Sequence, residues 1–436
     1  MEILRSLAGL LFFIGIAWLF SADRKHIDWK LVGVGLMLQL LFGWLVIKVP
    51  VVSAAFSYIS SGFVTFLDFS LAGSAFLFGD LARNSDSVPG TKHQLGFIFA
   101  FQVLPTVIFF STVSAGLYYL GILQKVVYGI AWVMSRTMKL SGPESLSAAG
   151  NIFLGQTEAP LLVKPYIKNM TRSELLCLMT GGMATIAGGV LAAYVSFLGG
   201  NDPVQKTLFA ASLLSASVMN APAGIVFAKI LYPERDRSRL NNNLQIAEDK
   251  IGVNLIDAMS RGAADGLKLA LNVGGMLLAF IAVIAMLNYL LQDVIGELTG
   301  LNTWIESQTK GRFSGLSLQY ILGQIFRVFA LAMGIDWSES LAVGSLLGQK
   351  TAINEFVAYL DLAKLKASGQ LSERSVILAT YALCGFSNFS SIAIQLGGIG
   401  SMAPEKQSEL SILGFRALFA ASLACMVTAT VAGLYI

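Results

Sequence analysis

The sequence predicts an all-α membrane protein with eight transmembrane helices, two re-entrant hairpins and an internal repeat of span, hairpin, broken span and span. Of its 436 residues, 55% are hydrophobic and only 13% are charged, about half the charged fraction of an ordinary soluble domain. Long segments contain no charged residue, and two interrupted segments resemble each other. A surface so poor in charge would not stay dissolved in water, so this composition excludes a soluble protein and a disordered one.

Charge-free apolar segments indicate the spans, because a bilayer core requires about 20 helical residues. Five segments have no charged residue at all: 175–201, 207–228, 269–292, 375–404 and 417–436. Three further apolar segments complete the predicted eight: 4–20, 31–47 and 95–123. The segment 51–80 is apolar but is interrupted by Ser, Gly and Asp68, so it is predicted to be an interfacial or partly inserted helix.

Two regions are apolar but too interrupted to cross as continuous helices. The first covers residues 142–167 and carries Glu158 and Lys164, and the second covers 313–362 and carries Lys350 and Glu355. Each is predicted to form short helices that meet at a polar tip. Irregular backbone at membrane depth is stable only where protein or water covers it, so both hairpins predict a cavity.

The two hairpins belong to a repeated unit. LGQTEA at 154–159 parallels LGQKTA at 347–352, and a span with a polar, glycine-containing centre follows each, at 180–185 and at 384–391. Such internal symmetry is typical of secondary transporters. The predicted organisation is N-terminal scaffold spans and an interfacial helix at 1–94, a first repeat at 95–231, a cytoplasmic polar loop at 232–252, and a second repeat at 253–436.

The net charge of +4 is too small to indicate a nucleic-acid partner. Basic residues gather instead in the connectors after the predicted first, third and fifth spans. Cytoplasmic loops of membrane proteins carry such an excess of Lys and Arg. We therefore expect these three loops to share the cytoplasmic side of the membrane.

Glu158 and Glu355 are the most informative polar residues. A carboxylate at the bilayer centre costs about 2.5–3.5 kcal/mol on insertion scales, so its presence there usually serves a function. We expect both carboxylates to bind a polar solute or the driving cation, since one occurs in each repeat. The alternative is that they pair with Lys164 or Lys350, or lie near the membrane interface.

Further polar groups flank these carboxylates. Gln156 and Thr157 add hydrogen-bond donors and acceptors beside Glu158, and the run from Phe386 through Asn388 to Ser391 adds an aromatic face with amide and hydroxyl groups. Together they predict a small pocket with a stacking surface. The alternative for the second set is helix–helix packing through small and polar residues.

A sodium ion would require hard oxygen ligands. Asn151, Thr185 and unwound backbone carbonyls could supply them. Alternatively, Asn151 simply caps a hairpin helix.

Three motifs resemble those of the concentrative nucleoside transporter family. GQKTAINEFVAY at 348–359 has all fixed positions of the family signature, GQTEAPLLVKPY at 155–166 looks like its first hairpin, and CGFSNFSS at 384–391 looks like its third signature. The motifs occur in order, and the resemblance covers essentially the whole chain.

The resemblance implies a homotrimer in which an inner transport domain of each protomer moves against a scaffold. It also implies the contacts of the site. Gln156, Thr157 and Glu158 would contact the nucleobase with Val190 packed beside it, and Glu355, Asn388 and Ser391 would hold the ribose beside Phe386. Sodium would lie at Asn151 and Thr185 with the backbone carbonyls of Leu154 and Ile186.

These inferences predict a sodium-coupled symporter that imports nucleosides such as uridine by alternating access. Proton coupling through Glu158 or Glu355 is the alternative within the family, and a channel for small polar solutes is the alternative outside it. We expect no enzyme, because no His, Cys or Ser constellation is placed for catalysis. The compact length favours the inner (plasma) membrane of a bacterium.

Overall fold

The computed structural model describes residues 2–82, 98–200, 202–246 and 252–436. Regular secondary structure in these ranges is helical, without a strand, which confirms the predicted all-α class. The predicted boundary at 94 and the predicted start of the third span at 95 lie outside the described residues, as does part of the predicted loop 232–252.

Seven helical segments of the described chain are long and apolar enough to cross a membrane, and an eighth is added if one bent pair counts as a single span. The seven segments are formed by α2 (Trp29–Lys48), α3 (Pro50–Asp68) with α4 (Ser70–Phe78), α5 (Phe99–Gln102) with α6 (Leu104–Tyr119), α10 (Arg172–Ala184) with α11 (Gly188–Gly199), α12 (Pro203–Leu231), α13 (Leu255–Asn288) and α21 (Gln407–Gly433). The predicted span 4–20 forms the shorter apolar helix α1 (Glu2–Leu19).

Some helices differ from the expectation. The segment predicted as an interfacial helix at 51–80 is helical from Pro50 to Ala82, which is long enough to cross a membrane; its position in the membrane stays a prediction. Helices α7 (Ile122–Met138) and α15 (Leu301–Thr309) were not anticipated. The span 375–404, by contrast, is broken as predicted: it forms α19 (Glu373–Leu383) and α20 (Phe389–Met402), and the break lies within the polar centre predicted at 384–391.

The hairpin regions consist of short helices around irregular turns. Region 142–167 contains α8 (Gly142–Gly150), an irregular tip and the short helices η4 (Ala159–Val163) and α9 (Lys164–Ile167). Region 313–362 contains α16 (Leu318–Ala332), α17 (Trp337–Ala352) and most of α18 (Glu355–Ala367). Helices α16 and α17 are bent by 116° relative to each other. The re-entrant character of each region, which would enter and leave the membrane on the same side, stays a prediction.

Side-chain caps fix where the central helices begin. Ser141 with Glu144 forms a capping box at the start of α8, and Thr171 with Glu174 forms another at the start of α10. Asn354 caps α18 and Asn388 caps α20. Each cap accepts a backbone N–H that has no partner within the helix.

The first helix break lies at 185–187, later than the polar centre predicted at 180–185. Gly181 and Gly182 lie within α10 and do not break it. Their lack of a side chain allows the first hairpin to pack closely against the helix. A Cβ atom at Gly181 would lie 2.9 Å from Nδ2 of Asn151, and one at Gly182 would lie 3.0 Å from Cβ of Gln156. The glycines therefore let the tip of the first hairpin rest directly on α10.

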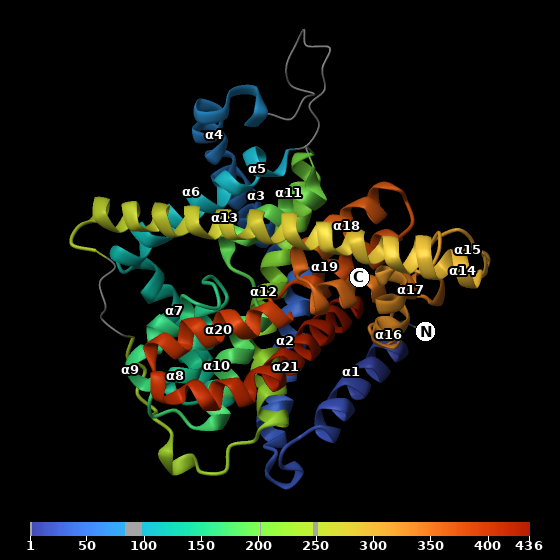
Figure 1. The fold of residues 1–436 in the computed structure, drawn as a ribbon. Coiled ribbons are helices and arrows are strands. Elements are labelled where there is room, and N and C mark those ends of the chain that lie inside the picture. The colour runs from blue at the N-terminus through green and yellow to red at the C-terminus, as the bar shows by residue number, and fades with distance from the viewer. Residues whose placement is uncertain (1, 83–97, 201, 247–251) are drawn as a thin grey trace.

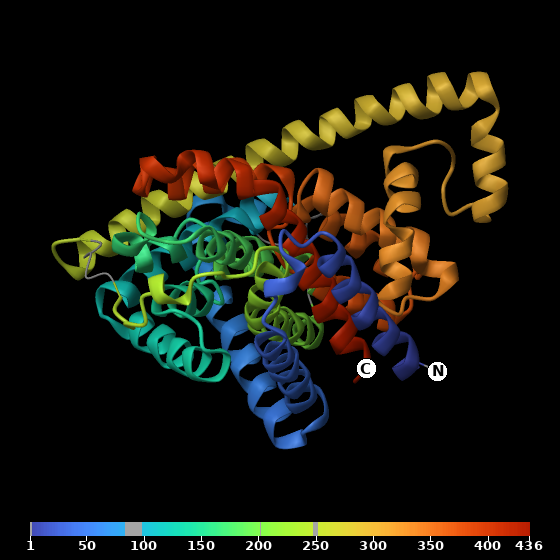
Figure 2. The ribbon, with the colours of Figure 1, turned by 90° about the horizontal axis from the view of Figure 1, so that it is seen from below.

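Figure 1 shows α13 crossing the width of the molecule, with α20 and α21 below it in this view. In Figure 2 the far end of α13 extends away from the bundle toward α15. Helix α13 packs along α6, whereas α21 packs against α10, α12 and α19. The small side chains of α12 and α21 permit this close packing, as is common in membrane bundles.

Hydrogen bonds pin the two helix breaks to each other. Nδ2 of Asn220, on α12, donates to the carbonyl of Ala184 at 2.8 Å and to the carbonyl of Cys384 at 2.6 Å. The thiol of Cys425, on α21, donates to the same two carbonyls at 3.4 Å each. These carbonyls end α10 and α19, so one amide and one thiol serve both breaks.

A buried charged cluster ties the other end of α12 to the first hairpin. Nζ of Lys229 forms an ion pair with Glu144 and donates to Oγ of Ser173 at 3.0 Å. Oγ of Ser141 donates to Glu174 at 2.7 Å. The capping boxes of α8 and α10 are therefore joined to each other and to α12.

The connector after α1 is paired with the connector after α12. Arg235 forms an ion pair with Asp23 at 2.7 Å, and Arg237 forms one with Asp28. Burial raises the pKa of Asp28, but hydrogen bonds from the backbone N–H of Leu31 and from Arg237 outweigh it, and the pKa lies below its usual value. Two of the predicted cytoplasmic loops thus lie at the same end of the bundle.

We predict that Asn220→Leu lowers the free energy of unfolding by about 1–3 kcal/mol, because it leaves two buried carbonyls with only a thiol donor. Thermal unfolding of the purified protein in detergent measures the effect. Ser217→Ala is the matched control, since the Ser217 hydroxyl is buried on the same helix without a hydrogen-bond partner. Equal midpoints for the two variants would contradict the bracing function of Asn220.

Candidate functional site

A continuous chain of hydrogen bonds joins the first hairpin to the second broken helix and the second hairpin. Nε2 of Gln156, in the hairpin tip, donates to Oγ of Ser391 at 3.1 Å. The backbone N–H of Ser391 donates to Oδ1 of Asn388 at 2.9 Å, and Nδ2 of Asn388 donates to Glu355 at 2.8 Å. Four predicted site residues, from both repeats, therefore meet in one buried network.

The position of each member follows from local helix geometry. Asn388 and Ser391 are the cap and the third residue of α20, so the cap itself brings their polar atoms together. Glu355 is the first residue of α18, directly after its cap Asn354. A side chain at the first position of a helix lies beside backbone N–H groups that have no partner within the helix.

Glu355 is 2% exposed and both of its oxygens accept hydrogen bonds. Besides Asn388, the hydroxyl of Tyr194 on α11 donates to it at 2.9 Å. The Tyr194 ring stacks on Tyr359 with ring centroids 4.1 Å apart, and the Tyr359 hydroxyl donates to the carbonyl of Thr380 at 2.8 Å. Lys350, considered above as an ion-pair partner, donates to the carbonyl of Ala382 at 2.9 Å.

The remaining predicted substrate residues differ in exposure, and the backbone carbonyl of one of them, Phe386, accepts the N–H of Asn388 at 2.9 Å. Glu158 is exposed and accepts the backbone N–H of Gly155 at 3.1 Å, within its own hairpin. Thr157 is exposed beside Gly398 of α20. Val190 is buried on α11, and Phe386 is partly buried in the second break.

The predicted sodium ligands gather where the first hairpin meets the first break. Asn151 ends α8 and is 1% exposed, and both polar atoms of its amide lack a hydrogen-bond partner. Thr185 ends α10, its hydroxyl donates to the carbonyl of Gly181 at 2.9 Å, and Leu154 and Ile186 are buried nearby in sequence. An unpartnered buried amide is costly, and a cation would satisfy its oxygen.

The predicted sodium ligands include no carboxylate: they are an amide, a hydroxyl and two backbone carbonyls. Among the described residues, no group of three or more His, Cys, Asp or Glu side chains is placed to hold a metal ion. A cation at Asn151 would therefore be held by neutral amide, hydroxyl and carbonyl oxygens, which suit a monovalent hard cation such as sodium.

Sequence reasoning missed three residues of the site and its support: Tyr194, Asn220 and Gln395. Gln395 donates to Oε1 of Gln156 at 3.3 Å, so it belongs to the network. Its spacing could have revealed it, because Gln395 follows Ser391 by one helical turn in a charge-free segment. Tyr194 and Asn220 give no comparable signal, since each lies alone in an apolar run.

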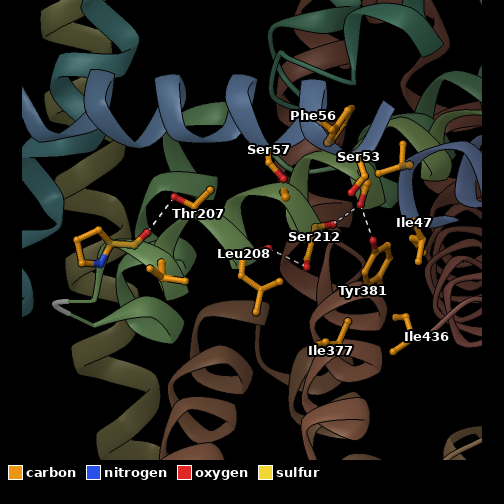
Figure 3. Close-up of a pocket in the computed structure, with 15 residues that line it drawn as sticks. Ile47, Ser53, Phe56, Ser57, Thr207, Leu208, Ser212, Ile377, Tyr381 and Ile436 are labelled. Atoms are coloured by element: carbon orange, nitrogen blue, oxygen red, sulfur yellow. Dashed lines mark hydrogen bonds between the residues drawn. The ribbon is translucent and has the colours of Figure 1, made fainter. Parts of the chain in front are cut away.

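A separate pocket of the described chain lies away from these residues. It has a volume of about 620 Å³ and lies between α2, α3, α12 and α19. As Figure 3 shows, Ser212 and Tyr381 point into this region from neighbouring helices, but Ser212 bonds to the carbonyl of Leu208 at 2.9 Å and Tyr381 to Ser215 at 2.5 Å. Its lining is mostly apolar, with six hydroxyl-bearing residues, and contains none of the predicted site residues.

A bundle of apolar helices with two interrupted helices at its centre, and a buried polar network between them, defines a membrane transport protein. Comparison with protein families agrees. Three family models match, described as Na+ dependent nucleoside transporter N-terminus at residues 8–81, Nucleoside recognition at 100–201, and Na+ dependent nucleoside transporter C-terminus at 212–433. The chain belongs to the Na+-dependent nucleoside transporter family.

Individual relatives support the same assignment. The chain is 40% identical to the uncharacterized transporter YutK of Bacillus subtilis, over 100% of both chains. It is also 40% identical to the human sodium/nucleoside cotransporter 1, covering 99% of this chain and 64% of that protein. The structure of CNTnw in an inward-facing substrate-bound state matches with a TM-score of 0.88 at 40% identity, over 100% of this chain and 99% of that one.

These findings confirm the family recognised from the three motifs, and with it a multi-pass membrane transporter that is not an enzyme. They also confirm sodium as the co-transported ion of the family. CNTnw variants have been solved in outward-facing and intermediate states as well, so the family contains alternating-access structures.

We predict that Asn388→Ala lowers the free energy of unfolding by about 1 kcal/mol or more, because it removes the cap of α20 and a donor to Glu355. Ser390→Ala is the control. It removes only a hydroxyl that donates to Oδ1 of Asn388 at 2.7 Å and leaves the cap in place. Denaturation midpoints in detergent compare them, and an effect of Ser390→Ala as large as that of Asn388→Ala would contradict this explanation.

Proposed function

We propose that this protein is a sodium-coupled symporter that imports nucleosides across the inner membrane of a bacterium by alternating access. The observation that carries the proposal is the buried network from Gln156 through Ser391 and Asn388 to Glu355. It combines amide, hydroxyl and carboxylate groups from both repeats at the place where two helices are interrupted. A nucleoside presents the complementary groups, since it joins a flat base to a polyhydroxylated ribose.

Glu355, Asn388 and Ser391 are the proposed ribose contacts, with Phe386 beside the sugar. Ribose hydroxyls are donors, and a carboxylate is a strong acceptor for them. Glu355, Asn388 and Ser391 now hydrogen-bond to the protein itself, so ribose binding would exchange bonds within the protein for bonds to the substrate. Such an exchange keeps the buried polar groups satisfied in both states.

Gln156, Thr157 and Glu158 are the proposed base contacts, with Val190 packing against the ring. All three belong to the tip of the first hairpin, whereas the ribose contacts belong to the second repeat. A nucleoside would thus bridge the two halves of the site. The exposed position of Glu158 leaves its carboxylate accessible to the edge of a base.

Sodium is proposed to bind Asn151, Thr185 and the backbone carbonyls of Leu154 and Ile186. Asn151 and Leu154 lie five and two residues before Gln156 in the same hairpin tip. An ion that orders this tip therefore also orders the base contacts. The two ligands would then share a reciprocal coupling free energy. This shared segment gives a physical reason for coupled transport.

For the whole molecule we propose the arrangement implied by the family. The scaffold spans at 1–94 and two repeats at 95–231 and 253–436, joined by the loop 232–252, would assemble as a homotrimer. The large apolar exposure of single helices such as α13, where Leu271 and Leu278 are 66% and 76% exposed, supports burial against lipid or other copies.

Uptake of radiolabelled uridine into proteoliposomes tests the proposal. We expect accumulation when an inward sodium gradient is imposed, and none with an inward proton gradient at matched membrane potential. Accumulation driven by protons alone would still support the nucleoside site, but it would contradict sodium coupling and favour proton coupling through a carboxylate. Absence of uptake under both gradients by folded protein would contradict the substrate class, and uptake that does not saturate would indicate a channel.

A separate prediction addresses the ion site. We expect Thr185→Val to raise the sodium concentration for half-maximal uptake by roughly three- to tenfold, since it removes a ligand oxygen but keeps the side-chain shape. Thr180→Val is the matched control, because the Thr180 hydroxyl is buried on the same helix without a partner. Equal sodium dependence of both variants and the native protein would exclude Thr185 as a ligand.

Glu355→Gln tests the ribose contact. We expect at least a tenfold loss of uridine uptake, because a neutral amide is a weaker acceptor than a carboxylate and its NH2 group faces the donors Tyr194 and Asn388. Glu306→Gln, on the exposed surface of α15, provides the comparison. Full uptake by correctly inserted Glu355→Gln protein would remove Glu355 from the site.

A further inference from the structure

We propose that Gln395 is a positioning residue that fixes the direction of the Gln156 amide, so that Gln156 offers N–H donors and the site prefers a base with a carbonyl, rather than an amino group, at the position it contacts. This inference rests on the proposed function, in which Gln156 contacts the nucleobase. It goes further by naming the residue that decides which nucleobase edge fits.

The contacts of Gln395 leave it one orientation. Its side chain is completely buried on α20, and Nε2 donates to the backbone carbonyl of Met179 at 3.0 Å and to Oε1 of Gln156 at 3.3 Å. A backbone carbonyl can only accept. If the Gln395 amide were reversed, two carbonyl oxygens would face each other in a buried site, so Met179 fixes the direction of Gln395.

The direction of the Gln395 amide in turn determines the direction of the Gln156 amide. Because Gln395 presents N–H groups, Gln156 must present its oxygen to them. Its nitrogen is then turned toward Oγ of Ser391, at 3.1 Å, which is a proposed ribose contact. A backbone carbonyl outside the site thereby decides which end of Gln156 faces the substrate.

The packing leaves little room for another arrangement. A Cβ atom at Gly182 would lie 2.7 Å from Nε2 of Gln395 and 3.0 Å from Cβ of Gln156. Both amides therefore lie directly on the bare backbone of α10. A glycine at this position is necessary for the interlocked pair.

The direction of the Gln156 amide determines which group of a nucleobase it can bind. One N–H of the Gln156 amide bonds to Ser391 and the second is available to the base, while its oxygen already accepts from Gln395. Uracil and cytosine have nearly the same shape, but uracil carries a carbonyl at position 4 where cytosine carries an amino group. The same contrast separates inosine from adenosine at position 6. At the atom it contacts, an N–H donor favours the carbonyl of each pair, because it cannot accept a hydrogen bond from the amino group.

Uptake of uridine and cytidine into proteoliposomes under the same sodium gradient tests the inference. We expect the native protein to favour uridine in Vmax/KM. Gln395→Met has a side chain of similar length and no hydrogen bonds, so the freed amide can reverse, and we expect the uridine-to-cytidine ratio to fall roughly three- to tenfold. The change should lie in KM, with an unchanged sodium concentration for half-maximal uptake.

Two further variants sharpen the test. Gln39→Met removes another buried amide, which donates to Thr428 at 2.7 Å, and should leave the ratio unchanged. Gly182→Ala should displace Gln395 and lower the ratio as Gln395→Met does, which gives a second route if Gln395→Met is poorly folded. A ratio unaffected by both site variants, an equal loss for the two nucleosides, or a native preference for cytidine would overturn the inference.

The outcomes separate this inference from the function on which it rests. Sodium-driven nucleoside uptake with an unchanged ratio would overturn only the positioning function of Gln395. Absence of nucleoside uptake by the folded native protein would overturn both.

Discussion

Two interrupted helices must keep their backbone carbonyls hydrogen-bonded inside a membrane bundle, and the rest of the structure depends on how they do so. At membrane depth water cannot serve the ends of α10 and α19. Asn220 and Cys425 donate to the carbonyls of Ala184 and Cys384 instead. Because the same two donors serve both carbonyls, the breaks must lie side by side. These bonds hold the two broken helices together beside the candidate site.

From the breaks, a second set of polar contacts extends into the site. It begins at the carbonyl of Met179 and passes through Gln395, Gln156 and Ser391 to Asn388, Glu355 and Tyr194. Each bond limits the orientation of the next group, and bonds in such chains strengthen one another in a low dielectric. The network therefore gives each donor and acceptor a defined partner and direction.

The opposite end of the first repeat is held by charge. Lys229 joins the capping boxes of α8 and α10 to α12, and the pairs Asp23–Arg235 and Asp28–Arg237 close the connectors over that end. These contacts tie the first hairpin to α10 and α12. By contrast, α13 packs along α6.

The sequence alone determined the membrane environment, the helical class, the two polar hairpins and most of the network, because charge-free segments and local caps depend on residues close in the chain. Asn388 and Ser391, for example, are joined by a cap that spans three residues. Only the tertiary structure decided that Tyr194 would meet Glu355, that Asn220 would donate to the carbonyls at both breaks, and that Gln395 would bond to Gln156. It also showed that Gly181 and Gly182 serve close packing and do not break α10. These contacts join residues up to 239 positions apart, and their partners are set by which helix faces meet, a property that no local pattern contains.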